Sequence, residues 1–380
     1  MAWIFRVPLP LASTASVAPR SGSPAVLCSA TESLSRPCGW RCLRACAVII
    51  GGGIRSLVRR SHMAGDSMDV ALPGPSTRTI IDRIGQIWPE HAGYLGKSFS
   101  GRDAPVLDVS EQLSSAILSL ASGDGARLDP LIADYRFLCE EIILPEEFHF
   151  RRNGSYRLGS FAEANRECYS NGPFMDRYMN GLLLSVVLWS NHAHAFSHFV
   201  KGYLPQLHDG ARHLEIGPGH GLLLYFAAAT RRLGHIAAWD VSPTSIAKTR
   251  HALDLLGIEQ PVDLIVQDVF EAPEPGPHER FDSIVMSEVL EHLETPVEAL
   301  RSAARWLEPG GQLWINVPAN SPAPDHIFLF ESLDHAEQLV RDAGLEVVEA
   351  RAFPMSGATL ERAVKHKLSI SCSVLARKPG

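Results

Sequence analysis

The sequence predicts an α/β fold in which a doubly wound, seven-stranded, mostly parallel sheet follows an N-terminal helical cap. From residue 211 onward, short apolar segments alternate with helix-like segments, which is typical of a parallel sheet. Residues 76–200 instead place apolar side chains three and four positions apart, which favours helices. The 380 residues, 46% hydrophobic and 20% charged, are enough to bury a core of this size.

Composition divides the chain into three parts. Residues 1–67 hold eight arginines, no lysine and two acids, a net charge of +6. A disordered tail, a targeting segment and an extension upstream of a true start at Met63 or Met68 all suit this stretch, and the three interpretations stay open. Residues 76–200 are the predicted cap and substrate region, and residues 201–380 the predicted α/β domain.

The charge balance bears on partners and location. The whole chain carries −7, so the 313 residues after residue 67 carry about −13. Proteins that bind nucleic acid usually present a basic face, so the acidic balance favours a small-molecule partner and makes nucleic acid unlikely. No apolar run reaches the roughly 18 residues that a membrane span needs. Cysteines scattered singly after residue 67 suggest reduced thiols and a cytoplasmic protein, or a mitochondrial one if residues 1–67 are a targeting peptide. The set Cys38, Cys42 and Cys46 is disfavoured as a metal cluster because no fourth ligand accompanies it.

The expected elements follow from local patterns. Seven apolar segments are expected as strands, at residues 213–216, 236–239, 262–266, 281–286, 312–317, 345–350 and 369–376. Ser242 and Thr295 stand directly before prolines, which is a helix-start signal. We expect helices at 221–233, 242–256, 296–307 and 333–343, and in the cap at 110–120, 128–143 and 174–200. The pair Asn153-Gly154 predicts a hairpin over residues 149–158.

A glycine-rich turn follows the first predicted strand, in the segment LEIGPGHG at residues 214–221. Glycines adopt positive φ and let the backbone approach a ligand, and the N-terminus of the next helix offers free N–H groups. Asp240 ends the second strand 19 residues after Gly221, where an acid accepts hydrogen bonds from ribose hydroxyls. Asp268 follows the third strand. The spacing GxGxG differs from the GxGxxG expected of a nicotinamide dehydrogenase.

The segments LEIGPGHG, WDVS, VQDV, FDSIVMSEVLEHL and LEPGGQLWINVP occur in the order and spacing of class I S-adenosylmethionine-dependent methyltransferases. The chain resembles this family over roughly residues 202–378. The resemblance implies a Rossmann-like sheet and S-adenosylmethionine as cofactor, with Glu215 at its methionine end and Asp268 at the adenine amino group. The cofactor-binding residues that it implies are Glu215, Gly217, Gly219, Gly221, Asp240, Val241, Asp268, Val269 and Ser287.

A possible metal site follows the fourth predicted strand. Glu288, Glu291 and His292 would share one face of a helix, and His326 lies in the loop after the fifth strand. Two carboxylates and two imidazoles suit a divalent Mg, Mn, Fe or Zn ion. The set is similar to the metal-dependent O-methyltransferases, namely the plant small-RNA 2′-O-methyltransferases and, more loosely, the ubiquinone-pathway O-methyltransferases. That similarity implies four ligands and a metal that activates the acceptor hydroxyl. A metal-free enzyme, with His292 or His326 as catalytic base, stays open.

The combined expectation is an enzyme that methylates a hydroxyl of a small molecule. Three alternatives stay open: C-methylation of a quinone-like acceptor, 2′-O-methylation of a nucleic acid, and a module that binds the cofactor without catalysis. Asn191 or His192 could serve the site or be ordinary polar residues, and Arg151 and Arg152 could meet a substrate anion or be solvated. Four aromatic residues could line an acceptor pocket or pack in the core: Phe161, Tyr169, Phe174 and Tyr178.

Overall fold

The computed structural model describes residues 73–123, 128–276 and 278–380, and these residues belong to one compact unit. The predictions for residues 1–67, including those for the cysteines at positions 38, 42 and 46, lie outside the described residues. Among the helices of the described ranges, none combines the length and the apolar character needed to cross a membrane.

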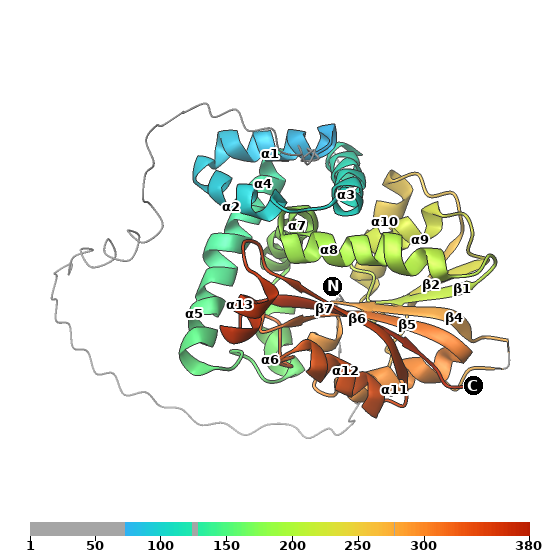
Figure 1. Ribbon diagram of the computed structural model, residues 1–380. Helices are drawn as coiled ribbons and strands as arrows, with labels where there is room; N and C mark the ends of the chain where they lie inside the picture. Colours follow the sequence, from blue (N-terminus) through green and yellow to red (C-terminus); the bar gives the residue numbers. More distant parts are fainter. Residues whose placement is uncertain (1–72, 124–127, 277) are drawn as a thin grey trace, which may run out of the picture. The chain divides into compact units, whose positions relative to one another are not determined.

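The sheet has seven strands in the order β3-β2-β1-β4-β5-β7-β6 (Figure 1). Strands β1 to β5 run parallel to one another, and β7 is antiparallel to both β5 and β6. The predicted sheet, mostly parallel with an antiparallel last strand, is therefore confirmed. The strands are β1 (Arg212–Ile216), β2 (His235–Asp240), β3 (Val262–Val266), β4 (Phe281–Ser287), β5 (Leu307–Ala319), β6 (Glu346–Pro354) and β7 (Ile370–Arg377).

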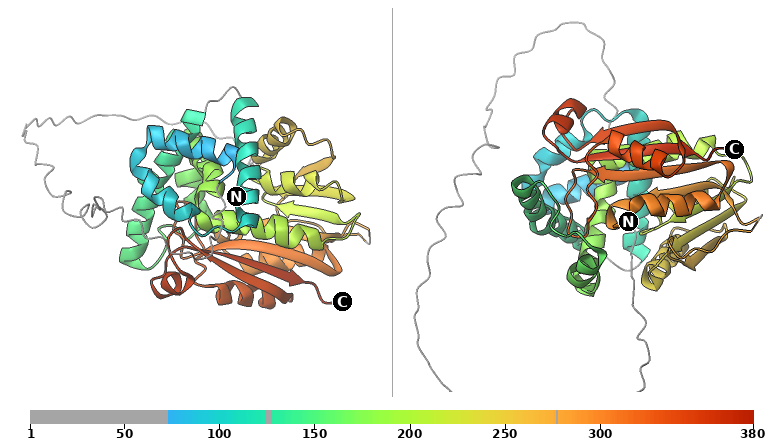
Figure 2. Two further views of the ribbon diagram at one scale, coloured as in Figure 1. Left: turned by 45° about the horizontal axis from the view of Figure 1, so that its top comes forward. Right: turned by 90° about the horizontal axis from the view of Figure 1, so that it is seen from below.

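Helices cover both faces of this sheet (Figure 2). Alternate residues of β4 point to opposite faces, so Val285 joins one core cluster while Ile284 and Met286 join the other. Ser242 caps its helix by accepting a hydrogen bond from the Ser245 backbone N–H. The helices of this part are α9 (Leu222–Ala229), α10 (Pro243–Leu255), α11 (Pro296–Trp306), α12 (Leu333–Asp342) and α13 (Leu360–Lys365).

The residues before β1 form a helical cap that shares a core with one face of the sheet. Ile80 and Ile132 of the cap belong to the same buried cluster as Val285 of β4 and Trp314 of β5. The cap comprises α1 (Pro75–Ile87), α2 (Ala92–Phe99), α3 (Ala104–Gly123), α4 (Leu128–Phe137), α5 (Leu144–Asn153), α6 (Phe161–Ala164), α7 (Gly172–Leu188) and α8 (Ser190–Ser197). Shorter π-helical and 3₁₀ turns join them: η2 (Pro89–His91), η3 (Leu138–Ile143), η4 (Asn165–Tyr169), η5 (His198–Tyr203) and η6 (Leu204–Gln206).

Two predictions about the cap were wrong. The pair Asn153-Gly154 ends α5 instead of turning a hairpin: Gly154 has a left-handed φ of 72°, and its N–H bonds to the Phe150 carbonyl at 2.8 Å. A positive φ serves a helix C-cap as well as a hairpin turn. The single helix expected over residues 174–200 is broken at Trp189, whose backbone is extended, so the chain bends between α7 and α8.

Candidate functional site

The glycine turn after β1 has the backbone that its sequence predicts. Gly217, Gly219 and Gly221 all have positive φ, at 72°, 53° and 72°. Thr249 of α10 donates a hydrogen bond from Oγ1 to the Gly219 carbonyl at 2.9 Å. A Cβ on Gly221 would lie 3.1 Å from the Thr249 methyl carbon, so the turn packs closely against α10. The close packing against α10 leaves no room for a side chain at Gly221, so the backbone itself shapes this part of the turn.

A cavity that is partly open to solvent lies at this turn and toward the carboxyl ends of β4 and β5, beneath α7 and α8. The strand order reverses between β1 and β4, and the ligand crevice of open α/β sheets usually lies at such a point. The polar lining residues are Ser185, His192, Glu215, His220, Ser287, Glu288 and Asn316, and the larger apolar ones are Leu182, Val186, Phe196, Leu222, Leu223 and Trp314.

Glu215 is the most deeply buried acid of this cavity, with 2% of its surface exposed. Burial raises the pKa of its carboxyl group to about 8, although the Leu224 backbone N–H donates to it. Among the described residues, its Oε2 atom has no hydrogen-bond partner. A buried carboxyl group with a free oxygen favours a cationic ligand, because a nearby positive charge stabilises the ionised form.

Asp240 and Asp268 lie at the ends of neighbouring strands, as predicted. The Asp240 carboxylate accepts hydrogen bonds from the Ser242 backbone N–H at 2.8 Å and from Ser245 Oγ at 2.7 Å. Asp268 accepts one from the Phe270 backbone N–H at 2.9 Å. These contacts fix both carboxylates at the carboxyl edge of the parallel strands, although neither residue belongs to the cavity lining given above.

The helix predicted to carry Glu288, Glu291 and His292 is not formed. Glu288 leaves β4 with a left-handed φ of 54°, and Leu290–His292 then form the 3₁₀ turn η7. Glu288 therefore points into the cavity, where its Oε1 accepts a hydrogen bond from Asn316 Nδ2 at 2.7 Å. Burial raises the pKa of Glu288 to about 7.

Three of the four predicted ligands nevertheless come together. One potential ligand atom from each of Glu291, His292 and His326 lies within 4.8 Å of the others, and these side chains are fully or almost fully buried. Glu288 is outside this three-residue cluster, but its charge, together with burial as the larger cause, raises the pKa of Glu291. Glu288 thus stands between the cavity and the cluster.

Backbone carbonyls set the tautomer of both histidines in the cluster. His292 Nδ1 lies 3.0 Å from the Asp325 carbonyl oxygen, and His326 Nδ1 lies 2.7 Å from that of Ser321. Because a carbonyl can only accept, each Nδ1 carries a proton, and in the neutral ring Nε2 keeps a lone pair. Both Nε2 atoms and both Glu291 carboxylate oxygens lack a hydrogen-bond partner within the described part of the chain.

Such a group of buried, unpartnered acceptors is costly without a ligand. A divalent cation would satisfy all of them, and histidines that donate through the second ring nitrogen are typical of metal sites. The residues present therefore fit a metal ion.

Sequence reasoning did not identify the contacts that join the cap to this cluster. The Asp325 carboxylate accepts hydrogen bonds from Tyr178 Oη at 2.9 Å and from Tyr169 Oη at 3.4 Å. These two aromatic residues are thus buried hydrogen-bond donors and do not line the cavity, and neither do Phe161 and Phe174. Position 325 lies 147 residues from Tyr178, and no local pattern signals a contact over that separation.

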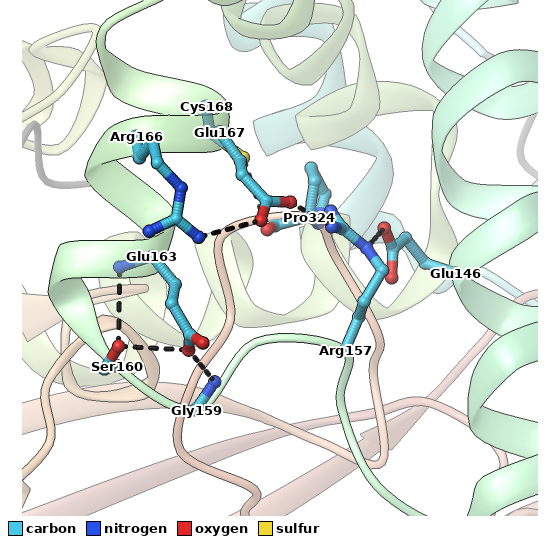
Figure 3. Close-up of polar contacts among 9 residues, drawn as sticks. All are labelled: Glu146, Arg157, Gly159, Ser160, Glu163, Arg166, Glu167, Cys168 and Pro324. Carbon is cyan, nitrogen blue, oxygen red and sulfur yellow. Dashed lines mark hydrogen bonds and ion pairs between the residues drawn. The ribbon is translucent and has the colours of Figure 1, made fainter.

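Further polar contacts hold the cap segment that faces the loop after β5, which carries His326 (Figure 3). Arg157 bonds to Glu146 of α5 at 2.9 Å and also to Glu167 of η4. Cys168 Sγ donates to the Pro324 carbonyl at 3.3 Å, directly beside Asp325. The loop that carries His326 is therefore held from two sides, by β5 and by the cap.

The sheet order, the glycine turn and the acids at the strand ends match the Rossmann-like fold of class I methyltransferases. Residues 188–366 match the family model described as a methyltransferase domain. The chain is 36% identical over 118 residues to a ubiquinone biosynthesis O-methyltransferase of Xanthomonas euvesicatoria pv. vesicatoria, covering 30% of this chain and 46% of that protein. It is 37% identical over 111 residues to the protein of the same name in Xylella fastidiosa, covering 28% and 42%.

The matched region spans less than half the length of these curated relatives. Among solved structures, a SAM-dependent methyltransferase from Aquifex aeolicus is 19% identical with a TM-score of 0.38, and the match covers 51% of this chain and 92% of that one.

Proposed function

We propose that this protein transfers the methyl group of S-adenosylmethionine to a hydroxyl oxygen of a small-molecule acceptor, with assistance from a divalent metal ion. The observation that carries the metal part is the buried, unpartnered set of Glu291, His292 and His326 next to Glu288. The curated relatives reported above are O-methyltransferases by name, which supports an oxygen acceptor.

The donor would bind with its methionine end at the glycine turn and its ammonium group at Glu215, where a buried carboxyl oxygen is free. Its ribose and adenine would meet Asp240 and Asp268. Val241 and Val269, which follow β2 and β3, and Ser287, which ends β4, would complete the contacts.

The acceptor would lie between the donor cavity and the three-residue cluster, beside Glu288. Glu291, His292 and His326 would hold the metal ion, which supplies a lowered pKa for the acceptor hydroxyl. In this arrangement His292 and His326 act as ligands rather than as bases. The acceptor oxygen attacks the methyl carbon, a C–O bond forms, and the C–S bond breaks with its electron pair moving to sulfur.

His192 is suited to receive the hydroxyl proton. Ser185 Oγ donates its one hydrogen to the Leu182 carbonyl at 2.7 Å, so it accepts from His192 Nδ1, which lies 3.1 Å away. The neutral ring therefore keeps a lone pair on Nε2. His192 belongs to the cavity lining, and His326 is near enough to contribute to the lowered pKa of His192, after burial as the main cause.

The test compares the purified protein with a Glu291→Gln/His326→Gln variant and a surface control, Glu259→Gln/His278→Gln. We expect the cluster variant to lose metal affinity by about tenfold or more and to lose metal-dependent methylation of a vicinal dihydroxybenzoate probe. Its affinity for S-adenosylhomocysteine should stay within about twofold of the starting value, since the cluster lies beside the donor cavity and not in it.

Elemental analysis, calorimetry and mass spectrometry of the methylated probe give the three measurements. Equal metal content in the cluster variant and the control would refute the metal part. Failure of the unmodified protein to bind S-adenosylhomocysteine would refute the methyltransferase proposal itself.

A further inference from the structure

Exposed apolar side chains gather on two helices that the proposed reaction does not use. The described residues contain seven large hydrophobic side chains that are strongly exposed, and four of them lie on α5 and α13. These are Leu144 (47% exposed), Phe148 (67%), Leu360 (43%) and Val364 (60%). Clusters of this kind on a protein surface usually mark a binding face.

The two apolar pairs lie on helices whose C-terminal ends are in contact. Each pair has i, i+4 spacing, so its members share a helix face, while Phe150 on α5 and Ala363 on α13 are buried. Arg151 Nη1 donates to the His366 carbonyl at 2.6 Å, which joins the ends of the two helices. Phe148 lies one turn before Arg151, and Val364 two residues before His366. The two helices that this hydrogen bond joins are labelled in Figure 1.

Basic residues surround these apolar side chains. Arg152, Arg362, Lys365 and Lys367 are exposed, and no ion pair engages them among the described residues. The acids of the same segments are mostly neutralised, because Glu147 pairs with Arg151 and Glu146 pairs with Arg157. Glu361 is the remaining acid of these two segments. This concentration of positive charge stands out in a chain whose net charge is −7.

We propose that α5 and α13 form a docking face for an anionic lipid surface, made of Leu144, Phe148, Leu360 and Val364 with the four basic residues Arg152, Arg362, Lys365 and Lys367. Apolar side chains that enter the headgroup region, ringed by Lys and Arg that attract anionic lipids, are the two components of interfacial binding. The contact is peripheral, since no described helix can span a membrane.

The docking face is directly connected to the loop of the candidate site. After α5, the chain turns at Gly154 and reaches Tyr156, whose ring centre lies 5.7 Å from that of His326. Tyr156 Oη also accepts a hydrogen bond from the Ser321 backbone N–H at 3.2 Å. Docking would thus bring the acceptor side of the site close to lipid, which fits an acceptor with an apolar portion; this consequence rests on the proposed function, whereas the docking face does not.

The test is sedimentation of the full chain with two kinds of vesicle: phosphatidylcholine alone, and equal amounts of phosphatidylglycerol and phosphatidylcholine. We expect binding to the anionic vesicles only, weakening as salt increases. Phe148→Ser/Val364→Ser and Arg152→Gln/Lys365→Gln should each lower the vesicle affinity about tenfold or more. The control is Ile265→Ser/Val266→Ser, which removes two apolar side chains of β3 that are 43% and 50% exposed and should bind like the unmodified protein.

Circular dichroism of each variant separates loss of binding from loss of folding. No vesicle binding by the unmodified protein, equal binding to both vesicles, or equal loss in the β3 control would overturn the proposal. A self-association that Phe148→Ser/Val364→Ser abolishes, with no vesicle binding, would assign the face to a second copy instead. Donor binding measured with S-adenosylhomocysteine is independent of all these outcomes, so failure of the proposed function remains distinguishable.

Discussion

At the scale of single residues, the burial of Glu215 makes the proposed binding of a charged donor testable. Its pKa is raised to about 8 because it is buried, so near neutral pH the unliganded protein holds it mainly protonated. A cationic donor favours the ionised form, and binding must then release this proton. We therefore expect donor affinity to rise between about pH 6 and 8, by at most about tenfold per pH unit.

The measurement is calorimetric titration with S-adenosylmethionine in buffers of different ionisation enthalpy, which counts the released protons. Glu215→Gln should bind more weakly and should lose the pH dependence. Burial lowers the pKa of His192 and His220 to about 4 and about 3, so these neighbours do not titrate in this range. Glu288, with a pKa near 7, does titrate there, and Glu288→Gln is the control that should keep the proton release. A pH-independent affinity in the unmodified protein would contradict the assignment of Glu215.

The role of His192 in turnover can be tested in the same way. Replacing it with Gln removes the ring nitrogen that Ser185 holds toward the cavity, so we expect a fall in kcat of about 10²-fold or more. The affinity for S-adenosylhomocysteine should change by less than about twofold. His194→Gln is the matched control, because His194 lies on the same helix, bonds to the Ser190 carbonyl at 2.7 Å and is outside the cavity lining. Equal turnover in the two variants, measured with the dihydroxybenzoate probe, would remove His192 from the reaction.

At the scale of elements, the sheet could be predicted from the sequence because each strand is a short apolar run between strong turn signals. The third strand was expected at residues 262–266 and has those bounds, and most other strands differ from expectation by one or two residues at an end. The fifth strand is longer than expected, at Leu307–Ala319, since it continues past both ends of its apolar run. Hydrophobic periodicity and turn residues are therefore sufficient to locate an element whose own side chains determine its conformation.

The wrong predictions lie where tertiary contacts choose between two local possibilities. Asn153-Gly154 allows a positive φ that suits a hairpin or a helix end, and the packing of Phe150 decides for the helix end. Nothing in the residues around Trp189 predicts the break between α7 and α8. That break matters for the site, since it lets α8 begin in a new direction and place His192 over the cavity.

In the candidate site, too, local features were predictable from the sequence, whereas the backbone that brings distant residues together was not. The glycine turn was predictable because positive φ is a local property of Gly217, Gly219 and Gly221. The grouping of Glu291, His292 and His326 was anticipated from a helix that does not exist: the 3₁₀ turn after Glu288 and the loop after β5 bring them together instead. A predicted grouping can thus form on a backbone that was not predicted, because adjacent parallel strands end at the same edge of the sheet whichever turn follows them.

At the scale of the whole molecule, the cap and the sheet depend on one shared core. The buried cluster that contains Ile132 of α4 also contains Val285 of β4 and Trp314 of β5. Replacing fully buried Ile132 with Ala should therefore lower the free energy of unfolding by about 2–5 kcal/mol. Because the core is continuous, the sheet and the cap should lose the same amount of stability.

Hydrogen exchange followed by mass spectrometry gives the direct measurement of this coupling. In the Ile132→Ala variant, the slowest amides of β4 should exchange faster by the same factor as those of α4. Ile265→Ala serves as the control, because that side chain is 43% exposed at the edge strand and its removal should change stability by less than about 0.5 kcal/mol. If Ile132→Ala speeds exchange in the cap and leaves β4 unchanged, the cap unfolds by itself. In that case the donor cavity, which α7 and α8 cover, would open by local unfolding of the cap and not only with global unfolding.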